Sequence, residues 1–144
     1  MKLKFDPNQR FQLDAIDAAV DIFEGQPLNQ GDFEIKLQHG YELKGLVQQD
    51  LGFGNNLSAS DDVLNANLKQ IQKRNNIHQA DSIETKGRNF AIEMETGTGK
   101  TYVYLRTAFE LNKKYGFKKF IVVVPSVAIR EGVLKSIEIM KEHF

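Results

Sequence analysis

The chain has 144 residues, of which 41% are hydrophobic and 26% charged, and its formal net charge is zero. This length allows one domain with a hydrophobic core, and the neutral charge argues against a globally basic nucleic-acid-binding protein. The absence of cysteine excludes disulfides and thiolate metal sites, and the absence of a long apolar run or a signal-peptide core predicts a cytoplasmic protein with no membrane partner.

The first 25 residues predict one amphipathic helix. Asp6 is suited to cap it, and Pro7 is suited to its first turn. Gly25 and Pro27 are helix-ending residues, so we expect the helix at about residues 7–24. Between these limits apolar residues recur at helical spacing, at Phe11, Ala15, Ile16, Ala19, Val20 and Phe23.

Residues 26–88 read as an α+β insertion that carries no specific chemistry. Alternating apolar and polar residues predict a β-hairpin over 33–47, and a Gln-, Asn- and Gly-rich stretch predicts a loop over 48–58. Ser60 is suited to cap a second helix, with two aspartates in its first turn and two basic residues near its end. Asn75 and Asn76 are expected to stop this helix, before an irregular stretch.

The last third, residues 89–144, has the pattern of an α/β protein. Residues 90–94 and 120–124 are short apolar runs that predict buried strands. A helix is expected between them at about residues 99–114, and another from about Ser126 onwards. Strand, helix and strand at this spacing predict a parallel βαβ core.

A glycine-rich loop links the first predicted strand to its helix. Gly97 and Gly99 permit backbone conformations that turn several N–H groups into one concavity, where a phosphate can bind. Lys100 is placed to reach the β- and γ-phosphates, and the Thr101 hydroxyl is placed to bind Mg²⁺. The alternative is a plain glycine-rich turn with an exposed lysine. The predicted cofactors are ATP and Mg²⁺, and the predicted contacts are Gln12, Thr96, Gly97, Thr98, Gly99, Lys100 and Thr101.

Two features resemble superfamily-two helicases. Met94 stands where the general phosphate-loop pattern has glycine, and the run Glu-Thr-Gly-Thr-Gly-Lys-Thr is similar to the helicase form. The segment at 10–16, Arg-Phe-Gln-Leu-Asp-Ala-Ile, resembles the element whose glutamine reads adenine, which implies this role for Gln12. Phe5 or Phe11 is then suited to pack near the base. The alternative for Gln12 is a solvent-facing position on an amphipathic helix.

The run at 124–132, Val-Pro-Ser-Val-Ala-Ile-Arg-Glu-Gly, occupies the place of helicase motif Ia. In such motors this turn contacts the backbone of the tracked strand, which makes Ser126 and Arg130 candidate nucleic-acid contacts. The alternative assigns Ser126 to capping the following helix and Arg130 to the surface. A single serine is able to do both.

Together these residues resemble the Res subunit of type III restriction-modification enzymes, most of all over residues 89–133. The resemblance implies the truncated start of a RecA-like domain of an ATP-dependent DNA translocase. It also implies a nuclease domain elsewhere in the subunit, double-stranded DNA as substrate, and a methyltransferase (Mod) subunit as partner. We find no Asp-Glu-x-His box in the sequence. We therefore expect this chain to bind nucleotide weakly and to have no motor or nuclease activity alone.

Two other interpretations remain open. The chain is also compatible with the front end of another superfamily-two helicase or repair translocase. It is compatible as well with a non-catalytic nucleotide-binding module. The expected division is a helix at 1–25, an insertion at 26–88 and the start of a motor core at 89–144.

Overall fold

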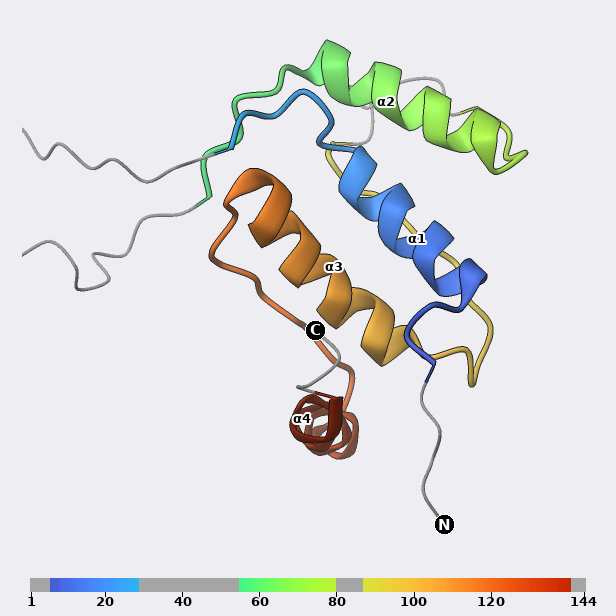
Figure 1. Ribbon diagram of the computed structural model, residues 1–144, viewed down its shortest axis with the longest axis vertical. Coiled ribbons are helices and arrows are strands. Elements are labelled where there is room, and N and C mark those ends of the chain that lie inside the picture. Colours follow the sequence, from blue (N-terminus) through green and yellow to red (C-terminus); the bar gives the residue numbers. More distant parts are fainter. Residues whose placement is uncertain (1–5, 29–54, 80–86, 141–144) are drawn as a thin grey trace, which may run out of the picture.

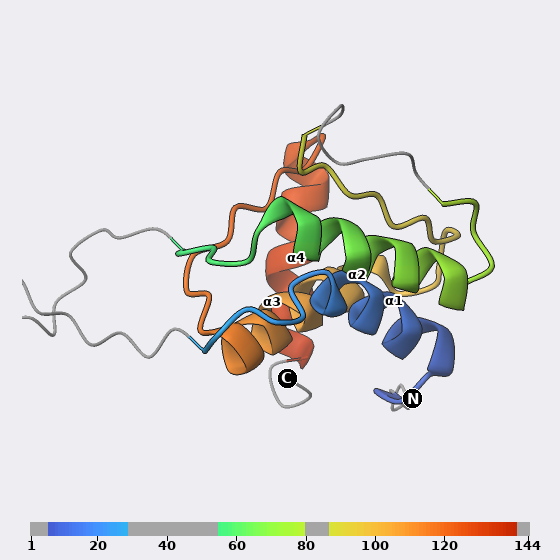
Figure 2. The same ribbon diagram turned by 90° about the horizontal axis from the view of Figure 1, so that it is seen from above.

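Three helices lie side by side in the computed structural model, which describes residues 6–28, 55–79 and 87–140. Helix α1 (Arg10–Asp21) lies in the middle, between α2 (Asp61–Arg74) and α3 (Lys100–Tyr115) (Figure 1). Helix α4 (Val127–Met140) runs across the direction of α3, as the view turned by 90° also shows (Figure 2). Within these ranges, no helix has the length and apolar character needed to cross a membrane.

The start of α1 differs from the prediction. The Asp6 carboxylate accepts a hydrogen bond from the backbone N–H of Asn8 at 3.0 Å. This contact closes a turn between Asp6 and Asn8, so the aspartate stabilises that turn and does not cap the helix. The N-cap of α1 is instead Gln9, whose side chain makes no capping hydrogen bond. At the other end the chain turns after Asp21, and Gly25 has a φ of +89°.

Helices α2 and α3 follow their local sequence signals closely. The Ser60 hydroxyl accepts a hydrogen bond from Val63 N–H at 3.4 Å and caps α2 as expected. Left-handed glycines flank α3, since its N-cap is Gly99 and its C-cap is Gly116. The Asn112 side chain donates to the Phe117 carbonyl at 2.7 Å and closes the chain reversal after α3.

The main core lies between α1 and α3. Phe23 packs edge-on against two further rings, with centroids 6.2 Å from Tyr115 and 5.3 Å from Phe117. A second, smaller cluster joins the end of α1 to α2 through Ile22, Leu64 and Ile71. The buried members of the main cluster are Ile16, Val20, Tyr102, Val103, Tyr115 and Phe117.

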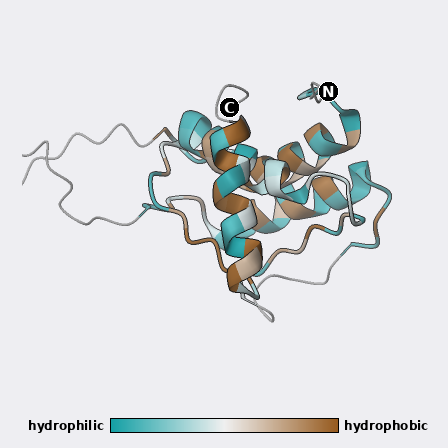
Figure 3. Ribbon diagram, turned by 90° about the horizontal axis from the view of Figure 1, so that it is seen from below, coloured by the Kyte–Doolittle hydropathy of each residue, from teal (hydrophilic) through white to brown (hydrophobic). Residues whose placement is uncertain are grey.

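The two predicted strands do not form in the part of the chain that the structure describes. Residues 90–94 and 120–124 have no assigned secondary structure, so the parallel βαβ core is not confirmed. A strand exists only through hydrogen bonds to a neighbouring strand, which local sequence cannot supply. Ile121 and Val123 are 92% and 88% exposed. Hydrophobic stretches also lie along α4 and along the segment that leads to it (Figure 3).

Side-chain amides attach the segment before α2 to the rest of the fold. Gln26 is 6% exposed; it donates to the Asn56 carbonyl at 2.9 Å. It also accepts from Ser58 N–H at 2.8 Å and from Ala59 N–H at 3.1 Å. The predicted hairpin at 33–47 lies outside the described residues. The helix α2 that follows is an integral part of the helical layer.

Candidate nucleotide-binding site

The glycine-rich loop turns directly into the first turn of α3. Gly97 has a φ of +80° and Gly99 a φ of +84°, both in the left-handed region that glycine adopts without strain. The Thr98 hydroxyl donates to the Glu95 carbonyl at 2.6 Å, which fixes the turn. Thr96 is exposed at the tip of the turn, and Thr101 is half-buried at the start of the helix.

Lys100 folds back over its own loop. Its ammonium donates to the carbonyl of Met94 at 2.5 Å and to the carbonyl of Glu95 at 2.7 Å. The side chain is exposed, so nothing buries this charge. Two backbone carbonyls therefore hold the ammonium beside the loop.

Gln12 of α1 is buried against the loop, and this rules out the solvent-facing alternative. Its side chain is 5% exposed, and its amide nitrogen donates to the Thr98 carbonyl at 2.8 Å. A Cβ added at Gly99 would lie 2.5 Å from that nitrogen, so the Gln12 amide would have to shift to make room for it. The amide oxygen of Gln12 is buried and has no hydrogen-bond partner among the described residues. A buried acceptor of this kind needs a donor, and the amino group of adenine is one.

Ser126 and Arg130 have local structural contacts. The Ser126 hydroxyl accepts a hydrogen bond from Ile129 N–H at 3.3 Å and so caps α4. Arg130 lies 3.3 Å from the Glu131 carboxylate in an exposed ion pair. Both structural alternatives are therefore present, and an exposed pair of this kind leaves the guanidinium accessible.

Sequence reasoning missed a series of side-chain hydrogen bonds that runs along α3 behind the loop. Arg106 donates from Nε to Glu110 at 2.7 Å and from Nη1 to the Tyr102 hydroxyl at 3.1 Å. The hydrogen bond to Glu110 raises the pKa of Arg106 above its already high usual value, so the group is a permanent cation. The one sequence signal for these hydrogen bonds is the spacing of four residues between Tyr102, Arg106 and Glu110, which places them on one side of a helix.

A glycine-rich turn at the start of a helix, suited to holding an anion, is the class of site that this geometry defines. A turn with two left-handed glycines opens a helix, a lysine lies beside it, and a buried glutamine from a distant helix contacts it. Such a turn directs backbone N–H groups and the positive end of a helix dipole towards an anion.

The chain belongs to the family described as "Type III restriction enzyme, res subunit", whose model matches residues 63–143. It is 41% identical over 144 residues to the type III restriction-modification enzyme EcoP15I Res subunit of Escherichia coli. It is 34% identical over 145 residues to the EcoPI Res subunit of Escherichia phage P1. These matches confirm the resemblance inferred from the sequence.

The matches cover nearly all of this chain but only a small part of each relative. The EcoP15I and EcoPI matches take in 96% and 97% of this chain, but only 13% of each relative. A third relative, the StyLTI Res subunit of Salmonella typhimurium, is 52% identical over 58 residues, which is 39% of this chain and 6% of that protein. The chain therefore spans about an eighth of the length of the first two relatives.

Proposed function

We propose that this chain forms the ATP-binding front end of a DNA-translocating subunit in a type III restriction-modification enzyme. The observation that carries the proposal is the contact of buried Gln12 with the loop at Thr98. It brings an amide suited to reading adenine against a turn suited to holding phosphates, although the two are 86 residues apart in sequence. A nucleoside triphosphate has both chemical features in one molecule.

The residues present suit ATP and Mg²⁺. Backbone N–H groups from Thr96 to Gly99 and the start of α3 would hold the phosphates, and Lys100 would exchange its two carbonyl partners for phosphate oxygens. The Thr101 hydroxyl would serve as a ligand to Mg²⁺. The unpartnered oxygen of Gln12 would accept from the adenine amino group. When bound, the metal supplies charge neutralisation at the β- and γ-phosphates.

The remaining parts of the proposal concern the whole protein. We propose that Ser126 and Arg130 contact the backbone of double-stranded DNA, the guanidinium by leaving its pairing with Glu131. The partner is a Mod methyltransferase subunit, the setting is the cytoplasm, and the fold is a RecA-like α/β domain. The names of the relatives support the DNA and restriction context, since each is a type III restriction-modification enzyme Res subunit.

Titration with Mg-ATP tests the proposal directly. The Lys100→Ala variant should bind Mg-ATP at least about 10-fold more weakly, because a charge-assisted hydrogen bond contributes about 1.5–3 kcal/mol. Lys113→Ala is the matched control, since Lys113 lies exposed in the last turn of the same helix. Equal affinities of wild type and Lys100→Ala would show that the loop does not hold the phosphates.

Two further variants separate the parts of the ligand. Gln12→Ala should reduce the preference for Mg-ATP over Mg-GTP, and Thr101→Val should reduce the gain in affinity that Mg²⁺ provides. For DNA, Arg130→Gln should weaken binding of a labelled duplex and lower the salt dependence of that binding by about one counterion. Unchanged salt dependence would remove Arg130 from the DNA contact.

A further inference from the structure

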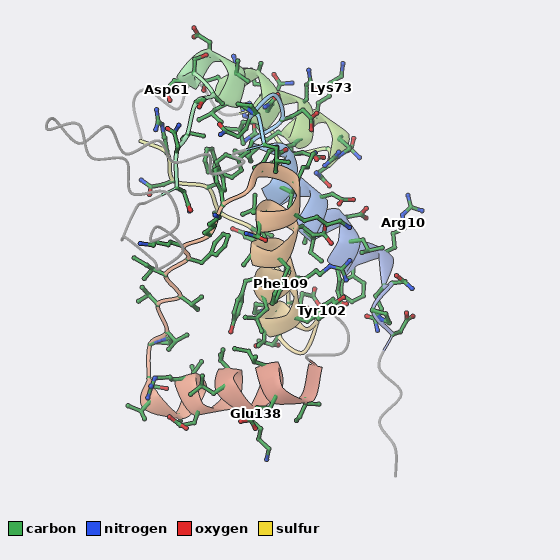
Figure 4. All side chains as sticks on the ribbon, turned by 60° about the vertical axis from the view of Figure 1, so that its left-hand side comes forward. Arg10, Asp61, Lys73, Tyr102, Phe109 and Glu138 are labelled. Atoms are coloured by element: carbon green, nitrogen blue, oxygen red, sulfur yellow. The ribbon has the colours of Figure 1, made fainter. Side chains whose placement is uncertain are left out.

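A relay of side chains starts immediately behind the phosphate loop and ends at the first turn of the chain before α1. Tyr102 follows Thr101 directly and is 1% exposed, with its ring in the main core. Its hydroxyl donates to the Pro7 carbonyl at 3.4 Å, a contact across 95 positions of sequence. Tyr102 lies at the start of α3, on the side that faces α1 (Figure 4).

The same hydroxyl is held from the other side by a cation. Arg106 donates to it at 3.1 Å and is itself paired with Glu110 at 2.7 Å. A phenol that accepts from a guanidinium becomes a better donor, because polarisation along a hydrogen-bond chain strengthens each member. The arrangement therefore favours one orientation of the hydroxyl, with its hydrogen directed at the Pro7 carbonyl.

The carbonyl at the end of the relay belongs to the turn that sets where α1 begins. Asp6 closes that turn on Asn8, and the N–H groups of Gln12 and Leu13 both donate to the Gln9 carbonyl. The turn and the first helical hydrogen bonds are thus continuous with the backbone that carries Gln12. A shift at Pro7 would move the amide of Gln12 relative to the Thr98 carbonyl.

We propose that Tyr102, oriented by Arg106, is a positioning residue for the base side of the nucleotide site. It links the helix that follows the phosphate loop to the turn that places Gln12, so that the base contact and the phosphate contacts keep one fixed spacing. The inference rests on the proposed function, and it assigns adenine selectivity to residues that do not touch the base. A displacement of about 1 Å at such a site is enough to weaken a directed hydrogen bond.

The test compares Tyr102→Phe with Tyr104→Phe in the 144-residue chain. The Tyr104 hydroxyl is buried and has no hydrogen-bond partner in the described part of the chain, so this variant removes the same atom from the same helix without breaking the relay. Each protein is titrated with Mg-ATP, Mg-GTP and Mg-tripolyphosphate, which has the phosphates and no base. Thermal unfolding of each variant is recorded alongside.

Tyr102→Phe should bind Mg-ATP about fivefold more weakly, because the variant loses both the long contact with Pro7 and the hydrogen bond from Arg106, which together correspond to about 1 kcal/mol. Its affinity for tripolyphosphate should stay within about twofold of wild type, and its ATP-to-GTP ratio should fall. Tyr104→Phe should change none of these. Arg106→Met should reproduce the loss, and combining it with Tyr102→Phe should add little, because both substitutions break one relay.

Equal losses for ATP and tripolyphosphate in Tyr102→Phe would mean a general loosening of the site and would overturn the positioning role. Unchanged ATP affinity would overturn it as well. A wild-type chain that binds neither ATP nor tripolyphosphate would overturn the proposed function itself. Binding of both ligands by wild type, combined with no effect of Tyr102→Phe, would remove only the relay.

Discussion

Substitution of Gly99 by alanine should be more costly than the same substitution at Gly97, although both glycines have left-handed backbones. Their φ values are +84° and +80°. The difference lies in what surrounds them. A Cβ at Gly99 would approach the amide nitrogen of Gln12 to 2.5 Å, whereas a Cβ at Gly97 would meet nothing within 4 Å among the described residues.

The expected magnitudes follow from two separate contributions. A left-handed backbone costs a residue with a Cβ about 1–2 kcal/mol, and this applies at both positions. The entropy that alanine removes from the unfolded chain is also shared, so it cancels in the comparison. At Gly99 the Gln12 amide must also move, and the loss of its hydrogen bond to Thr98 adds about 1–2 kcal/mol. Gly99→Ala should therefore lower the free energy of unfolding by about 1–2 kcal/mol more than Gly97→Ala does.

Urea unfolding followed by far-ultraviolet circular dichroism, without nucleotide, measures these costs. The two glycine variants are made in the wild-type chain and again in a Gln12→Ala background. Removing the Gln12 side chain removes the obstacle, so the excess cost at Gly99 should disappear in that background. Equal costs at the two glycines in the wild-type chain, or an excess that survives Gln12→Ala, would refute the contact as its cause.

Three further outcomes follow from other parts of the fold. Gln26→Leu should lower the free energy of unfolding by about 1–3 kcal/mol, because it removes the hydrogen bonds of a buried amide and leaves two partly buried N–H groups without their acceptor. The exposed Gln79→Leu should not have this effect, and equal effects of the two substitutions would contradict the reasoning. Partial desolvation of the exposed Asp17, then the charge of Asp21, raises the pKa of Asp17. Ionisation of Asp17 therefore destabilises the fold: the cost is absent below the unfolded pKa of 3.8 and is complete above the higher folded pKa. Asp17→Asn should therefore stabilise the chain at pH 7 by less than about 1 kcal/mol, and a gain persisting at pH 3 would exclude this cause. The exposed apolar run that contains Ile121 should make the chain self-associate. Ile121→Lys should weaken that association in sedimentation experiments. A wild-type chain that stays monomeric throughout the micromolar range would argue against self-association through this run.

Local signals in the sequence were sufficient for the glycine turn and for three of the helices, α2, α3 and α4. Ser60 and the charges at both ends of α2 act within a turn or two of the residues that they stabilise. The glycines around α3 likewise determine its ends through their own backbone conformations. The start of α1 was predicted wrongly, because Asp6 has two local uses and only the folded backbone selects between capping a helix and closing a turn.

Tertiary structure alone decided which residues surround the loop. The sequence suggested Gln12 by resemblance, but its burial against Thr98 depends on α1 packing beside α3. The contacts of Tyr102 with Pro7 and of Gln26 with Ser58 join positions that no local pattern relates. The sequence by itself determined the glycine turn and the helix start of the predicted phosphate-binding loop, because glycine conformations and a helix start are local properties of the chain. Strand pairing and the surroundings of Gln12 are properties of distant segments brought together, and only the folded chain specifies them.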